Sequence, residues 1–298
     1  MGHRTDFFIL GAAKCGTTAI FEYLSSHPDV FMPACKEPNF FCTDIGTFSA
    51  VSTLAEYEAL FAPSPPHALR GEASAMYLYS EVAISRIMAH NPAAKVVVIL
   101  RHPVDAARSF HAAAWGYGHD DVADFEEAWR LQNERRMGRH LPANWPDPKT
   151  LHYGTLYRFA PQVKRVLQHV PRQQCLILVY EEFFAAPAAH FPRVLEFLGL
   201  RVHRRASFPI VNPAVRPRSP RLARLLRQPP GWFRSIAPLR RVVHALGLHP
   251  LRMLQRANTG KGYKGPLREA FRGELLRYFA DDVMELEQLL GRPLWPMR

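Results

Sequence analysis

Cysteine is scarce in this 298-residue chain, and its four cysteines follow no pairing pattern. They stand at Cys15, Cys35, Cys42 and Cys175, with no C-x-x-C pair and without the His/Cys spacing of a zinc site. Both a disulfide framework and a zinc centre need such spacings. The sequence therefore argues against both, and it fits a reduced compartment.

Long hydrophobic runs are also missing. No 18 apolar residues stand in a row, and residues 1–6 lack the apolar core of a secretory signal. We therefore expect neither a membrane span nor an export peptide. The expected location is cytoplasmic, and a peripheral membrane contact is left open. At 48% hydrophobic residues the chain can bury a large core. It is expected to form a single domain over residues 1–298, with no internal repeat.

Acidic residues are absent from one long segment. From Phe197 to Arg268 there are 16 Lys and Arg and no Asp or Glu, whereas the rest of the chain has 22 basic and 26 acidic residues. Such a segment attracts an acidic sugar polymer, an anionic membrane surface, a nucleotide or nucleic acid, or it is a solvated surface. Its prolines divide it into short helices such as Arg221 to Arg227. We expect a basic helical insertion over about residues 214–257, not a second sheet.

The most informative stretch is the apolar run Phe7 to Leu10 with the small-residue turn that follows it, Gly11-Ala-Ala-Lys14-Cys-Gly-Thr-Thr18. It predicts a strand, a phosphate loop and a helix, because the first turn of a helix offers unpaired N–H groups and favours an anion. The spacing is not that of a Walker A loop, since Lys14 precedes the second glycine. A plain turn between strand and helix is the alternative.

A second strand with a polar end is predicted at Ala94 to Leu100. Its β-branched residues do not alternate with polar ones, as expected for a central parallel strand buried on both faces. Arg101-His-Pro and a helix from about Val104 follow. Ligands bind beyond the carboxyl ends of such strands, so Arg101 and Ser109 can address one phosphate. With another buried strand at 175–180, the fold class is α/β, with a central mainly parallel sheet flanked by helices.

Three loops carry further candidates. Lys36 and Glu37 stand between prolines and before two phenylalanines, on a stiff backbone; a solvated surface pair is the alternative. Ser74, in a small-residue turn after Glu72, is either a ligand contact or a helix N-cap. The late loop from residue 258 to 266, with two lysines among three glycines, suits a phosphate.

The remaining pattern predicts helices separated by one long loop at 140–153. The helices are expected at 17–26, 124–136, 156–170, 191–198, 267–279 and 281–290.

Together, the Lys14 loop, the 96–109 strand and helix and the Lys261-Gly-Tyr loop resemble the cofactor-binding elements of sulfotransferases that use 3′-phosphoadenosine 5′-phosphosulfate (PAPS). The resemblance is to the bacterial and heparan-sulfate types and covers nearly the whole chain, with Lys36-Glu-Pro-Asn-Phe-Phe41 and Trp295. It implies a P-loop-like fold, transfer of a sulfuryl group, PAPS as co-substrate with 3′-phosphoadenosine 5′-phosphate (PAP) as product, no metal, and a C-terminal cofactor cap over about residues 258–298.

The motifs and the resemblance together give the candidate site. Lys14 and Glu37 are the expected catalytic residues, with Glu37 as general base and His102, His111 or Glu72 next in line. The expected cofactor-binding residues are Lys14, Cys15, Gly16, Thr17, Thr18, Arg101, Ser109, Lys261, Gly262, Tyr263 and Lys264. The expected substrate-binding residues are Lys36, Glu72 and Ser74.

The acceptor is left open. Asn39 stands where some glycan sulfotransferases have histidine, and Ala73 where several have lysine. The expected partner is a hydroxyl-bearing acceptor such as an anionic glycan, a lipid or a small molecule, or an amine in place of the hydroxyl, with no specific nucleic acid.

Three other classes are weaker matches. A P-loop-like kinase or NTPase needs the other Gly/Lys order and usually an Asp after an apolar strand, where this chain has Arg101. A cysteine phosphatase needs an arginine six residues after Cys15, where this chain has Phe21. A non-enzymatic protein that binds anionic surfaces leaves the three loops unexplained.

Overall fold

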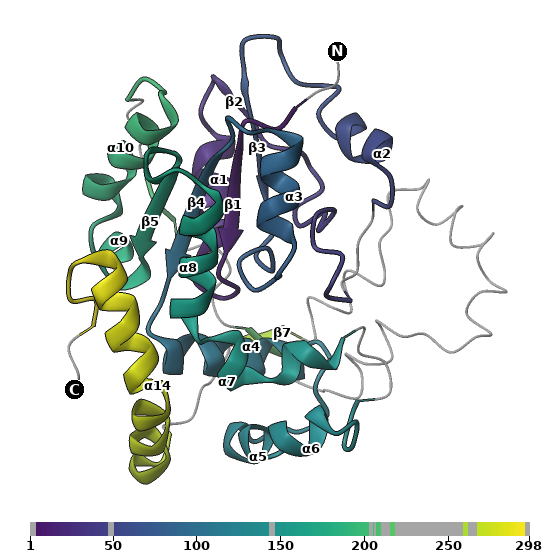
Figure 1. Ribbon diagram of the computed structural model, residues 1–298, viewed down its shortest axis with the longest axis vertical. Coiled ribbons are helices and arrows are strands. Elements are labelled where there is room, and N and C mark those ends of the chain that lie inside the picture. The colour runs from purple at the N-terminus through teal and green to yellow at the C-terminus, as the bar shows by residue number, and fades with distance from the viewer. Residues whose placement is uncertain are drawn as a thin grey trace, which may run out of the picture.

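The computed structural model describes residues 4–46, 51–142, 147–202, 205, 207–209, 215–217, 259–261 and 267–295 (Figure 1). Most of the predicted basic insertion, with the helix expected at Arg221 to Arg227, lies outside the described residues, as do Gly262, Tyr263 and Lys264. No described helix has the length and apolar character needed to cross a membrane.

The centre of the molecule is a five-stranded parallel sheet in the order β2-β3-β1-β4-β5. The prediction of a central parallel sheet is confirmed. Strand β1 is buried throughout, and all of β4 but its first residue is buried, as expected of apolar strands covered on both faces. The strands are β1 (Phe7–Gly11), β2 (Val30–Phe31), β3 (Leu69–Ala73), β4 (Lys95–Leu100) and β5 (Cys175–Val179).

Helices cover both faces of the sheet, as Figure 1 shows. Along the sheet, the connection from β1 to β2 runs in one direction, and the connections from β3 to β4 and from β4 to β5 run in the opposite direction. Because such crossovers are right-handed, α1 lies on one face of the sheet, and α3 and α8 lie on the other. Tyr23 of α1 packs edge-on against Phe191 of α10, 5.9 Å between ring centroids, which places α10 on the α1 face. These helices are α1 (Thr17–Ser25), α3 (Ala83–His90), α8 (Phe159–His169) and α10 (Pro187–Leu198).

The other described helices lie around the ends of the sheet. They are α2 (Leu54–Ala59), α4 (Pro103–Gly116), α5 (Phe125–Arg130), α6 (Gln132–Arg136), α7 (Tyr153–Leu156), α9 (Tyr180–Ala185) and α14 (Glu269–Leu290), with 3-10 turns η1 (Pro148–Leu151) and η2 (Arg172–Gln174).

Three helix predictions are corrected. The two closing helices are one 22-residue helix, α14, because no glycine or proline stands between Phe279 and Asp281 to break it. It ends at Gly291, whose φ of 67° suits glycine. The predicted helix at 124–136 is divided into α5 and α6 at Leu131, and the one at 156–170 begins at Phe159.

The basic segment is bracketed by a short ribbon. Strand β6 (Val215–Pro217) pairs antiparallel with β7 (Thr259–Lys261). The expectation of no second sheet is therefore wrong, because a pairing between strands so far apart in sequence leaves no local pattern.

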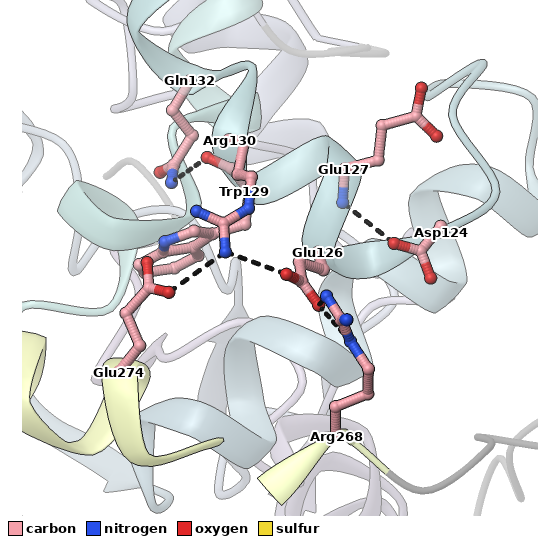
Figure 2. A network of polar contacts seen from close by, with 8 residues as sticks. All are labelled: Asp124, Glu126, Glu127, Trp129, Arg130, Gln132, Arg268 and Glu274. Atoms are coloured by element: carbon pink, nitrogen blue, oxygen red, sulfur yellow. Dashed lines mark hydrogen bonds and ion pairs between the residues drawn. The ribbon is translucent and has the colours of Figure 1, made fainter. Parts of the chain in front are cut away.

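Helix α14 is joined to α5 by charged side chains, shown in Figure 2. Arg130 Nη2 lies 2.8 Å from Glu126 Oε1 and 3.2 Å from Glu274 Oε2. Arg268, just before α14, donates from Nε to Glu126 Oε2 at 2.9 Å. These pairs are exposed and individually weak, but they fix where α14 begins beside α5.

A buried ion pair supports the segment after α4. Arg135 donates to both carboxylate oxygens of Asp120, at 2.7 and 2.9 Å, and neither side chain is exposed. The Tyr153 hydroxyl also donates to Asp120, and His111 Nε2 of α4 donates to Val122 O at 2.9 Å. Removing one partner of such a pair leaves an uncompensated buried charge.

Asp120→Ala should therefore lower the free energy of unfolding by about 3–5 kcal/mol, measured by urea denaturation. The control is Asp120→Leu combined with Arg135→Met, which replaces both charges by apolar groups and should recover most of the loss. Equal losses in the single and the double variant would contradict the assignment of the cost to an unpaired Arg135.

Candidate functional site

The phosphate loop connects β1 to α1 and leaves three consecutive amide groups free where the helix begins. Lys14 and Gly16 have φ angles of 64° and 95°, so the loop turns through the left-handed region just before the helix. The N–H groups of Gly16, Thr17 and Thr18 have no hydrogen-bond partner in the part of the chain that the structure describes. Free N–H groups at the start of a nine-residue helix favour an oxyanion at this position.

Close packing holds the loop in this shape. A Cβ at Gly16 would lie 2.5 Å from the Phe184 ring, so only glycine fits. On the core side of the loop, the buried Tyr157 hydroxyl donates to Ala13 O at 3.0 Å. Cys15 is fully buried, its Sγ lies 3.5 Å from Ala13 O, and burial raises the pKa of its thiol. The Cys15 side chain therefore packs in the core, and the place of this residue in the cofactor-binding loop stays a prediction.

Lys14 is the cation of the loop. Partial desolvation of its ammonium lowers its pKa, the charges of Arg101 and Lys36 lower it further, and Glu37 opposes them. Lys14 thus shares one electrostatic environment with Arg101 and Glu37, which come from different strand ends. An anion bound here would relieve the repulsion among the cations.

Arg101 follows β4 at the same edge of the sheet. Its Nη1 lies 3.4 Å from Lys14 O, and its guanidinium stacks on the Tyr180 ring at 4.5 Å. Its buried Nε has no hydrogen-bond partner in the described structure. Ser109 lies two turns along α4 and is almost buried. An arginine held by stacking, with one donor unused, is suited to an anionic ligand.

A carboxylate ties the chain's C-terminal segment to this edge. Glu181 accepts from the His102 backbone N–H at 3.0 Å through one oxygen and from the indole of Trp295 at 2.8 Å through the other. The His102 and Trp295 rings meet edge-on, 5.8 Å between centroids. Desolvation lowers the pKa of His102, which disfavours its charged form. Glu181 therefore fixes the turn that carries Arg101.

The Lys36–Phe41 loop forms the other side of the site. Glu37 and Asn39 have φ angles of 60° and 54°, on either side of Pro38. Lys36 Nζ lies 2.5 Å from Glu37 Oε1, and the Glu37 side chain is 44% exposed. Glu37 therefore keeps a solvent-accessible carboxylate beside Lys14, as a general base requires.

Glu72 and Ser74 do not lie on the surface of the site. Both are fully buried, and Ser74 Oγ donates to Glu72 Oε1 at 2.6 Å. Burial raises the pKa of Glu72 to about 7, against the effect of three hydroxyl donors. Their prediction as substrate-binding residues is incompatible with this burial, because no acceptor atom can reach them. Ser74 is not a helix N-cap either, since the next helix is α3, which begins at Ala83.

Other predicted residues divide into two groups. Lys14, Gly16, Thr17, Thr18, Lys36, Glu37 and Arg101 lie at or beside the carboxyl ends of β1, β3 and β4. Ser109 is buried on α4, and its contact with the cofactor stays a prediction. Lys261 is described only as backbone of β7, and Gly262, Tyr263 and Lys264 lie outside the described residues. In the described chain, no group of three or more His, Cys, Asp or Glu gathers as metal ligands would.

Sequence reasoning missed the roles of Tyr157, Tyr180, Glu181 and Trp295 at this edge. Tyr180 and Glu181 directly follow β5, a strand that the sequence predicts to be buried. Their position at a third strand end is therefore the signal that would have found them. Tyr157 and Trp295 give no such signal, because they reach the site only through tertiary packing.

Comparison with known proteins agrees with this geometry. Residues 4–212 match the family model described as "Sulfotransferase domain". Human heparan sulfate glucosamine 3-O-sulfotransferase 3B1 is 29% identical over 193 residues, 65% of this chain and 45% of the relative. Mouse bifunctional heparan sulfate N-deacetylase/N-sulfotransferase 4 is 28% identical over 206 residues, 67% of this chain and 23% of the relative. The chain thus spans less than half the length of these relatives.

A solved structure extends the likeness over the whole chain. A sulfotransferase from Alicyclobacillus acidocaldarius has a TM-score of 0.69 and 26% identity, and the alignment covers 98% of this chain and 97% of that one. The family match covers more than half of the sequence, and the fold, the phosphate loop and the strand-end arginine agree with it. The chain therefore belongs to the family of PAPS-dependent sulfotransferases.

Proposed function

We propose that this protein transfers a sulfuryl group from PAPS to a hydroxyl or amine of an acceptor, with Glu37 as general base. The observation that carries the proposal is the convergence of free loop amides, Lys14, Arg101 and Glu37 at one edge of the sheet. Lys14 feels the charges of both Arg101 and Glu37, so cations, free amides and an exposed carboxylate share one site. That combination suits an anionic donor that meets a neutral nucleophile.

The residues have distinct tasks in this reaction. The Gly16–Thr18 amides and Lys14 hold the 5′-phosphosulfate, and Arg101 with Ser109 binds the 3′-phosphate. Glu37 accepts the proton of the acceptor group while its oxygen or nitrogen forms a bond to sulfur. The bond from sulfur to the bridging phosphate oxygen breaks, and Lys14 stabilises the negative charge that develops on that oxygen. Such in-line transfer depends on positioning and electrostatics.

The proposed acceptor is a glycan or another hydroxyl- or amine-bearing molecule. Support comes from the relatives, one named as a heparan sulfate glucosamine 3-O-sulfotransferase and the other as a heparan sulfate N-deacetylase/N-sulfotransferase. Asn39 stands where some glycan sulfotransferases have histidine and Ala73 where several have lysine, so a different acceptor from heparan sulfate is proposed. The acid-free segment 197–268, with its 16 basic residues, favours an anionic acceptor.

The nucleotide preference can be measured without an acceptor. PAP at about 100 times its Kd should add about 2.7 kcal/mol of stability, seen as a higher Tm. ATP with Mg²⁺ should stabilise less. Lys14→Ala should reduce the rise in Tm that PAP causes. Lys164→Ala should not, because Lys164 is an exposed lysine of α8. A larger shift with ATP–Mg²⁺, or enzymatic release of its γ-phosphate, would favour a kinase or NTPase.

Arg101→Ala should remove most of the preference for a nucleotide with a 3′-phosphate. A charge-assisted contact contributes about 1.5–3 kcal/mol, or roughly 10- to 150-fold in the ratio of Kd values for PAP and adenosine 5′-phosphate. Arg172→Ala is the matched control, because Arg172 precedes β5 and lies at the opposite edge of the sheet. An unchanged ratio in Arg101→Ala would remove this residue from the 3′-phosphate site.

Glu37→Gln should separate proton transfer from cofactor binding. The change keeps the shape of the side chain but removes the base, so kcat should fall by roughly 10²–10⁴ while the Kd for PAP stays near its original value. Turnover is measured by mass spectrometry as addition of one SO₃ group, across a panel of acceptors.

Glu134→Gln is the control, since Glu134 of α6 pairs with Arg139, beyond the end of that helix, and is also solvent-accessible. If Glu37→Gln retained the kcat of the original protein on a true acceptor, the base would have to be sought among other groups such as His102.

A further inference from the structure

Glu72 is a buried carboxylate without a cation partner. It is fully buried at the end of β3, and no Lys, Arg or His in the described chain forms an ion pair with it. Three hydroxyls donate to it instead: Ser74 at 2.6 Å to Oε1, and Tyr57 and Tyr77 at 3.1 Å each to Oε2. Burying a carboxylate without a cation partner costs free energy of folding. A functional role would explain why Glu72 is retained.

Two of these hydroxyls reach the loop that carries Glu37. Ser74 Oγ accepts the Asn39 N–H at 3.0 Å, and the Tyr77 hydroxyl accepts the Phe41 N–H at 3.3 Å. Each of these two hydroxyls donates its proton to Glu72 and keeps a lone pair that accepts from the loop amide. The Tyr57 hydroxyl also donates to Glu72, but its other partner is Thr5.

The loop needs such support. Glu37 and Asn39 both have positive φ, a conformation that persists only when the surrounding structure imposes it. The Glu37 N–H donates to Ala73 O at 3.0 Å, and Asn39 Nδ2 donates to Glu37 O at 2.9 Å. The Asn39 side chain closes the loop on itself, whereas the three backbone N–H bonds lead to Ala73 at the end of β3 and to Ser74 and Tyr77 in the turn after it. The direction of the Glu37 side chain is thus set from the end of β3.

We propose that Glu72 is a positioning residue for Glu37, and that it acts through the hydroxyls of Ser74 and Tyr77, which hold the Glu37–Phe41 backbone. This inference rests on the proposed function of Glu37. Glu72 itself meets no substrate. Its role is to orient two hydroxyls so that they accept from the loop.

The two tyrosines provide a matched test. Tyr77→Phe and Tyr57→Phe each remove one donor from the same oxygen of Glu72 and keep the ring, but only Tyr77→Phe also removes the acceptor of a loop amide. We expect Ser74→Ala and Tyr77→Phe to lower kcat about 10- to 100-fold, as small misplacements of a catalytic group do. The loss of kcat in Glu72→Gln should fall in the same range, whereas the kcat of Tyr57→Phe should stay within about twofold of that of the original protein. The Kd for PAP should not change in any of them.

Two further readouts separate positioning from general loss of stability. In the Glu37→Gln background, Ser74→Ala should lower kcat no further, because its effect passes through Glu37. Hydrogen exchange of the Asn39 and Phe41 amides should accelerate at least about tenfold in Ser74→Ala and Tyr77→Phe respectively, and not in Tyr57→Phe. Equal losses of kcat in the two tyrosine variants, or unchanged exchange in Ser74→Ala, would overturn the inference.

The proposed function is judged separately. If the original protein gives no PAPS-dependent product with any acceptor, the proposed reaction fails, and with it the role of Glu37 as base. If it does turn over and Ser74→Ala retains full kcat, the reaction stands and only the positioning role of Glu72 is wrong.

Discussion

The site depends on how β1 ends beside β4. The pairing of these strands shifts register between Ile9 and Gly11, and the Ala12 N–H then donates to Ile99 O at 2.8 Å. Gly11 has a φ of 144°, and a Cβ there would lie 2.7 Å from Ala75 O, so only glycine can make this turn. The irregularity directs the phosphate loop toward the residue that follows β4. Arg101 can therefore reach Lys14 O, so the two strand ends lie close enough together to address one ligand.

The same edge concentrates positive charge before any ligand is bound. Lys14 loses hydration and is repelled by Arg101 and Lys36, and Glu37 compensates only in part. Packing keeps these groups together: the Tyr180 ring supports Arg101, and Phe184 holds the loop at Gly16. A site prepared in this way spends little free energy on ordering when an anion arrives, because folding has already fixed the donors.

The sequence predicted what depends on local pattern. The β-branched run of β4 and the small-residue loop after β1 each identify a strand end, and parallel topology brings Lys14 and Arg101 together. Prediction from the sequence failed where the role of a residue depends on the direction of its side chain. Cys15 belongs to the loop in sequence but points into the core, and Ser74 follows a strand end but faces inward. The pairing of β6 with β7 depends on chain segments far apart, for which no local pattern exists.

Two carboxylates act on the same loop in different environments. Glu37 lies on the surface beside two lysines, whereas Glu72 lies beneath it, and the charge of Glu37 contributes to the raised pKa of Glu72. An acceptor's proton can reach Glu37 from solvent-accessible space, but no path leads it to a group that is fully buried. Burial therefore agrees with the two proposed roles, proton transfer for Glu37 and backbone support for Glu72, although sequence alone offers both as candidate bases.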